Sequence, residues 1–242
     1  MSISKPTWQG DERRPRLRLR LGEVESLVPR FFRLFGPTHP IGPEDGPPVL
    51  VIPGFVAHDR TTNALRRALA DAGWRVHGWE MGLNKGAKAD TIDRLKARLD
   101  AIAPDGKLLV VGWSLGGLFA RELARAVPDR VSAVVTLGSP FSGDPKQNNV
   151  WRMYEWIAGH KVDDPPLPRI TAKPPVPHLA LWSRRDGLVA VRSARGLEGE
   201  RDKHVELTCT HMGFGVSARA GRDVVREIGV FLKEHSLSPT VR

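Results

Sequence analysis

The chain has one cysteine, Cys209, and no apolar run that approaches the roughly 18 residues of a membrane-spanning helix. A single cysteine excludes an internal disulfide and fits a reducing compartment. The first 20 residues carry positive charge without a continuous apolar stretch behind it, so they do not resemble a secretory signal. These absences predict a cytoplasmic protein, at most peripheral to a membrane.

The sequence also lacks zinc-knuckle spacing, a basic zipper and aromatic–basic nucleic-acid motifs, so no specific nucleic-acid partner is expected. Its net charge of +10 favours anionic partners in general. We interpret this charge as a solvated basic surface, with weak contact to an anionic membrane as a secondary expectation. The length of 242 residues and the hydrophobic content of 40% are enough for one sizeable core.

Residues 1–45 differ from the rest of the chain, and we treat them as a basic amphipathic segment with a linker ahead of a main domain at 46–242. Arginines alternate with apolar residues, and from Val24 onward the apolar spacing suits an amphipathic helix that Pro29 would interrupt. Such a helix can lie on an anionic membrane or pack on its own domain; we favour packing. A Pro- and Gly-rich stretch follows at 36–48.

The main domain alternates short apolar runs with helical patterns, which predicts βαβ units. Several runs are nearly continuous in apolar residues, as strands buried on both faces are. We therefore expect an α/β fold with a mostly parallel sheet of about six strands and helices on both faces. The predicted strands are 49–53, 74–79, 107–112, 131–137, 178–182 and 204–209, and the predicted helices are 61–72, 91–103, 115–127 and 217–235.

Residues 109–119 (LVVGWSLGGLF) place a serine between two glycines where a strand passes into a helix. Ser114 needs a sharp turn there, and Gly112 and Gly116 leave room for it on either side. The helix that follows points its positive dipole end at the serine. An ordinary glycine-rich turn is the alternative, but the strand before and the helix after favour a catalytic nucleophile.

A catalytic serine requires a base that accepts its proton and a third group that orients the base. Among eight histidines, His211 lies just past the last predicted strand, where Gly213 and Gly215 permit a tight loop. Asp186 follows the fifth strand and completes the order Ser, Asp, His. Asp186 also suits an ordinary Asp-Gly turn, and its rival Asp202 precedes the last strand, on the wrong side of the sheet.

The developing oxyanion needs backbone donors that already point at it. One is expected to be the N–H of Leu115, directly after the nucleophile. The other should come from the loop after the first strand, where Gly54 is followed by Phe55 as donor and pocket wall. A simple Pro-Gly turn is the alternative at this position.

These segments resemble the α/β-hydrolase superfamily, and within it the compact lipase- and esterase-like members. The resemblance extends over residues 49–235 and implies a Ser-Asp-His triad that acts without a metal or organic cofactor. The chain has Pro53-Gly54 where many relatives have His-Gly. Many relatives also have two further strands ahead of the first one, where this chain has the basic segment, so a reduced sheet is expected. The matching segments are VIPGF (51–55), GWSLGG (112–117), TLGSPFSG (136–143), SRRDGLV (183–189) and THMGFG (210–215).

The segment 141–177 is longer than an ordinary crossover and contains several aromatic residues, so we expect a short lid-like insertion or pocket wall. A crossover helix with core aromatics explains the same residues equally well. Cys209 is expected in the core. The predicted substrate contacts are Gly54, Trp113, Phe141, Trp151 and Tyr154.

The residues therefore predict a serine hydrolase that cleaves small or lipid-like carboxylic esters through an acyl-enzyme on Ser114. An acyltransferase or thioesterase would use the same three residues. A non-catalytic basic membrane- or partner-binding protein that retains the fold is the alternative of another class. The oligomeric state stays open.

A chain that begins at Ile41 tests the role of the N-terminal segment. If residues 1–40 cover apolar surface of the main domain, the truncated protein should unfold at a lower temperature and be less soluble. Thermal unfolding measures whether residues 1–40 stabilise the main domain, and sedimentation with anionic vesicles measures whether they bind a membrane. A soluble, equally stable and fully active truncation that only loses vesicle binding would contradict the packing role.

Overall fold

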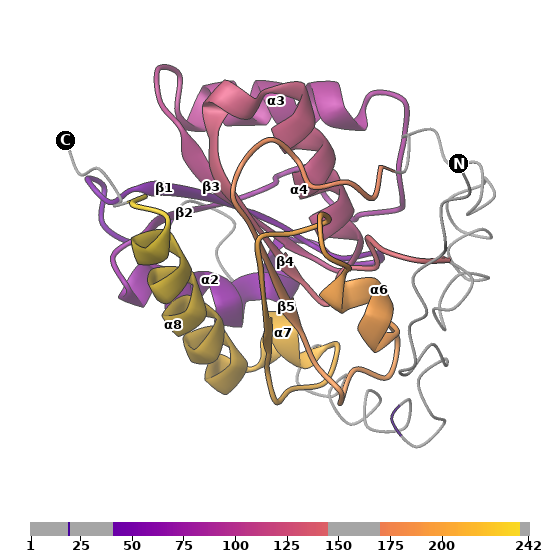
Figure 1. Ribbon diagram of the computed structural model, residues 1–242. Helices are drawn as coiled ribbons and strands as arrows, with labels where there is room; N and C mark the ends of the chain where they lie inside the picture. The colour runs from indigo at the N-terminus through magenta and orange to yellow at the C-terminus, as the bar shows by residue number, and fades with distance from the viewer. Residues whose placement is uncertain (1–18, 20–40, 145–169, 238–242) are drawn as a thin grey trace.

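The computed structural model describes residues 41–144 and 170–237, together with Leu19. Most of the predicted N-terminal segment and of the insertion, including Trp151 and Tyr154, therefore lies outside the described residues. The described chain forms a central sheet with helices on both faces (Figure 1).

Six parallel strands form one sheet, in the order β2-β1-β3-β4-β5-β6. The predicted α/β class, with a mostly parallel six-stranded sheet, is thus confirmed. The largest boundary difference is at the last strand, which ends at Glu206 rather than at Cys209. The strands are β1 (Pro48–Ile52), β2 (Arg75–Gly78), β3 (Leu108–Trp113), β4 (Val131–Leu137), β5 (His178–Trp182) and β6 (Lys203–Glu206).

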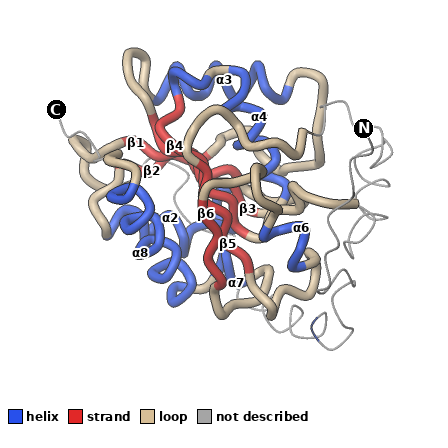
Figure 2. Tube along the Cα trace, viewed as in Figure 1, coloured by secondary structure: helices blue, strands red, loops and turns tan. Residues whose placement is uncertain are grey.

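Helices α2 (Asn63–Asp71) and α8 (Ala218–Glu234) cover one face of the sheet, and α3 (Thr91–Ile102) and α4 (Leu115–Ala126) cover the other (Figure 2). All four match predicted helices to within two residues. The structure adds short helices that the sequence pattern did not predict. These are α6 (Val191–Arg195), α7 (Gly213–Val216) and the 3-10 turns η1 (Asp59–Thr62) and η2 (Pro128–Arg130).

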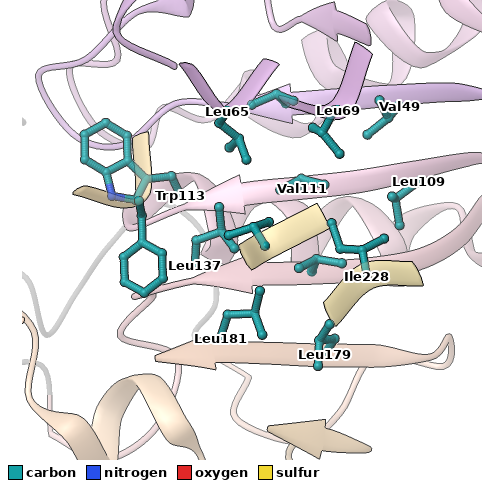
Figure 3. Packing of buried hydrophobic residues seen from close by; sticks show 14 of the residues in the cluster. Val49, Leu65, Leu69, Leu109, Val111, Trp113, Leu137, Leu179, Leu181 and Ile228 are labelled. Carbon is teal, nitrogen blue, oxygen red and sulfur yellow. The ribbon is translucent and has the colours of Figure 1, made fainter. Parts of the chain in front are cut away.

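Alternate residues of each central strand enter two separate hydrophobic clusters. Val49 of β1 faces the cluster under α2 and α8, whereas the next residue, Leu50, faces the cluster under α3 and α4. Figure 3 shows the first cluster, where Leu65 and Leu69 of α2 and Ile228 of α8 lie over the strands. Burial on both faces explains why the strand sequences are continuously apolar.

The strand register brings the carboxyl ends of the strands to one edge of the sheet. Ile52, the last residue of β1, pairs with Gly112, and Trp113 pairs with Leu137 at the end of β4. Trp182 of β5 pairs with Glu206 of β6. The loops after β1, β3, β5 and β6 therefore leave the sheet from the same edge. Among the described residues, no helix is both long and apolar enough to cross a membrane.

Two histidines are buried in strands. Burial, and next the charges of Arg98, Arg75 and Arg66, together lower the pKa of His77 to about 4. Its Nε2 atom has no hydrogen-bond partner among the described residues. Burial, and next the charge of Arg121, hold the pKa of His178 well below its usual range.

These shifts predict that the protein loses stability in mild acid. Between pH 6.5 and about 4 the unfolded chain binds protons that folded His77 does not, so the free energy of unfolding should fall as the pH falls. His77→Leu removes this titration and should flatten the dependence. Urea unfolding at pH 7 and at pH 4.5 measures the difference, and an unchanged pH dependence in His77→Leu would refute the assignment.

Candidate active site

Ser114 lies at the turn between β3 and α4 with φ 55° and ψ −122°, a region that side-chain-bearing residues rarely adopt. Its N–H donates to the carbonyl oxygen of Leu137 at 2.9 Å, which ties the turn to β4. Two glycines make the turn possible. A Cβ atom at Gly112 would overlap the backbone of Gly116, and one at Gly116 would overlap the carbonyl oxygen of Ile52. The serine therefore stands on a strained turn, as a nucleophile elbow requires.

Asp186 and His211 meet as a buried pair. The distance between Asp186 Oδ2 and His211 Nδ1 is 2.7 Å, and each residue is 3% exposed. The other carboxylate oxygen accepts the N–H groups of Leu188 and Val189, both at 2.8 Å. Because a carboxylate oxygen accepts hydrogen bonds, the short contact fits donation from His211 Nδ1 to Asp186 Oδ2.

Trp113, directly before the serine, joins the histidine loop to the nucleophile turn. Its indole Nε1 donates to the carbonyl oxygen of His211 at 3.1 Å, and the two rings lie 5.8 Å apart between centroids. Trp113 is only 2% exposed. Trp113, which we predicted as a substrate contact, thus also anchors the loop that carries His211.

Gly138 was not predicted as a site residue, although it lies in the quoted segment TLGSPFSG. It follows β4 with φ 54° and lies directly against the Asp186–His211 pair. A Cβ atom there would lie 3.0 Å from Asp186 Oδ2 and 3.2 Å from His211 Nδ1. One feature of the sequence could have indicated this role: Gly138 directly follows the strand 131–137. In the sheet, that strand is the neighbour of the strand that precedes Ser114.

The predicted oxyanion loop packs on the serine from the β1 side. A Cβ atom at Gly54 would lie 3.1 Å from the Ser114 Cβ atom, so only glycine permits this approach without displacement. Phe55 is half-buried in the same loop. Leu115 is the first residue of α4, where backbone N–H groups have no acceptor within the helix. The two predicted donors thus lie on either side of the serine turn.

Other predicted residues lie elsewhere. Asp202 accepts the N–H of His178 at the start of β5, at the opposite end of the sheet from Asp186. Phe141, a predicted substrate contact, is 1% exposed and packs beneath the guanidinium of Arg121. Cys209 is buried in the cluster under α2 and α8. Among the described residues, no group of three or more His, Cys, Asp or Glu side chains could hold a metal ion.

The fold and the strained serine turn define an α/β hydrolase. A family model described as the alpha/beta hydrolase fold matches residues 47–190. The chain therefore belongs to the α/β-hydrolase family.

Two curated relatives are pimeloyl-[acyl-carrier protein] methyl ester esterases. The protein from Nitrosospira multiformis is 26% identical over 125 residues, which cover 46% of this chain and 45% of that one. The protein from Salmonella heidelberg is 41% identical over 58 residues, or 24% of this chain and 22% of that one. The chain thus matches less than half the length of these relatives. A solved membrane phospholipase A shares the fold, with a TM-score of 0.61 and 16% identity, covering 92% of this chain and 97% of that chain.

Gly138→Ala should lower activity by about 10²-fold, because the added methyl group displaces the acid–base pair and such misplacement is costly. Gly73→Ala is the matched control. Gly73 also has a positive φ, of 92°, but nothing lies within 4 Å of a Cβ atom there. Both variants should lose stability from backbone strain, and turnover of p-nitrophenyl esters should fall only in Gly138→Ala. Equal activity in the two variants would contradict the assignment.

Proposed function

We propose that the protein is a serine hydrolase that cleaves carboxylic esters through an acyl-enzyme on Ser114. The observation that carries this proposal is the 2.7 Å contact between Asp186 and His211, on a loop that Trp113 holds beside the strained serine turn. The printed activities of the curated relatives, which are methyl ester esterases, support the reaction class.

In the proposed reaction, Ser114 Oγ attacks the carbonyl carbon of the ester while its proton passes to His211 Nε2. The N–H groups of Leu115 and Phe55 stabilise the oxyanion of the tetrahedral intermediate. His211 then returns the proton to the departing alkoxide, and the carbon–oxygen bond to the alcohol breaks. A water molecule attacks the acyl-enzyme by the same route, releasing the acid and restoring the serine. Asp186 holds the imidazole in the tautomer that this sequence needs.

The proposed substrates are small or lipid-like esters. The curated relatives are named as pimeloyl-[acyl-carrier protein] methyl ester esterases and the solved neighbour as a membrane phospholipase A, and both names support this choice. Trp151 and Tyr154 stay predicted acyl contacts, because both lie outside the described residues. A series of p-nitrophenyl esters with short and long acyl chains measures the chain-length preference. Adding an alcohol or a thiol and analysing the products shows whether water is the preferred acceptor.

Ser114→Ala should abolish labelling by a fluorophosphonate probe, because the probe reacts with the activated serine. Asp186→Ala should lower kcat by roughly 10⁴-fold, the scale seen when the acid of such a triad is removed. Asp202→Ala is the control: it also removes a carboxylate that accepts a backbone N–H, at the other end of the sheet. Labelling that survives in Ser114→Ala, or equal losses in the two aspartate variants, would refute the proposed mechanism.

A further inference from the structure

One buried residue joins the loop after β2 to the predicted oxyanion loop. Asn84 is fully buried, and no role described above uses it. Its side-chain Nδ2 donates to the carbonyl oxygen of Pro53 at 2.9 Å, and its Oδ1 accepts the N–H of Gly86 at 3.2 Å. Its backbone carbonyl accepts the N–H of Val56 at 2.8 Å, and its backbone N–H donates to Ala57 at 2.8 Å. Three of these four bonds end on residues 53–57.

The oxyanion loop needs such support because it contains a strained turn. The N–H of Ala57 donates to the carbonyl oxygen of Gly54 at 3.1 Å, which closes a four-residue turn. Its third residue, Val56, has φ 53°, as a type II turn requires. Glycine usually occupies that position, and a β-branched residue there is a marked exception. Such a conformation persists only where the surroundings hold it, and the bond from Val56 N–H to Asn84 does so.

The same bonds determine where the Phe55 N–H points. In a planar trans peptide, the C=O and N–H groups face opposite ways. The Gly54 carbonyl faces Ala57 inside the turn, so the Phe55 N–H of that peptide faces out of the turn. Asn84 holds the preceding peptide through the Pro53 carbonyl, while Gly54 rests against Ser114. The direction of the Phe55 N–H therefore depends on a loop that is held from both sides.

We propose that Asn84 is a positioning residue that holds the Phe55 N–H toward the oxyanion before the substrate arrives. This inference rests on the proposed function and adds to it a residue that does not touch the substrate. A donor already in place stabilises the transition state without reorganising at the moment of reaction. Asn84 should therefore affect the transition state far more than the bound substrate.

The test compares Asn84→Ala with the unchanged protein on a p-nitrophenyl ester. We expect kcat to fall about 10- to 100-fold while KM changes by less than about twofold. A trifluoromethyl ketone, whose carbonyl carbon bonds to Ser114 Oγ and becomes an oxyanion, should lose affinity by the same factor as kcat. The carboxylic acid with the same acyl chain forms no such adduct, so its inhibition constant should not change.

Asn84→Asp is the second variant, and it tests the same hydrogen bond if Asn84→Ala does not fold. It keeps the size of the side chain and an acceptor for Gly86, but it cannot donate to the Pro53 carbonyl, so it should show the same selective loss. Asp202→Ala controls for a general loss of stability, since it removes a hydrogen bond at the far end of the sheet.

An unchanged kcat in both Asn84 variants would overturn the positioning role and leave the proposed function intact. Equal losses of ketone and acid affinity, or a matching loss of kcat in Asp202→Ala, would show a merely structural residue. Fluorophosphonate labelling that persists in Ser114→Ala would refute the proposed function itself, whatever the Asn84 variants do.

Discussion

On either side of Ser114, where β3 passes into α4, Gly112 and Gly116 leave no room for a Cβ atom, and the rest of the site depends on this close backbone packing. A Cβ atom at Gly116 would overlap the carbonyls of Ile52 and Pro53, so α4 begins directly against the end of β1. On the other side, the N–H of Ser114 is bonded to Leu137 at the end of β4. The serine turn is thus held between two neighbouring strands. Its strained dihedral angles persist because both neighbours are themselves buried parts of the sheet.

The loops on the two sides of the serine are held by different means. On the β1 side, the carboxylate of Asp59 accepts the N–H groups of Trp79 and Glu80, so the loops after β1 and β2 are joined there as well as at Asn84. On the other side, the Asp186–His211 pair is packed against Gly138, and Trp113 bonds to the backbone of the histidine loop. Buried polar groups with fixed partners give a rigid arrangement, which is what electrostatic preorganisation requires.

Behind the site, Arg121 joins α4 to the chain that returns from the insertion. Arg121 is 1% exposed, and its guanidinium donates to the carbonyls of Thr171, Ala172 and Glu200 at 2.6–2.8 Å. It also donates to His178 Nδ1 at 2.9 Å. Burial lowers the pKa of Arg121 to about 9, which still leaves it charged at neutral pH. Removing one partner of such a buried charge is costly, so this cation couples α4, the helix after Ser114, to the residues that follow the predicted insertion.

The sequence by itself determined the alternating strands and helices, the serine turn, and the loops that carry Asp186 and His211, because these depend on local periodicity and on glycines next to a strand end. Where β6 ends and where α7 forms were not predictable. After Glu206, Leu207 still bonds to Trp182, and GFGV has two glycines that weaken any helical pattern. Only the tertiary structure decided which residues Gly138, Asn84 and Arg121 contact, because most of their partners lie tens of residues away and come together through the strand order.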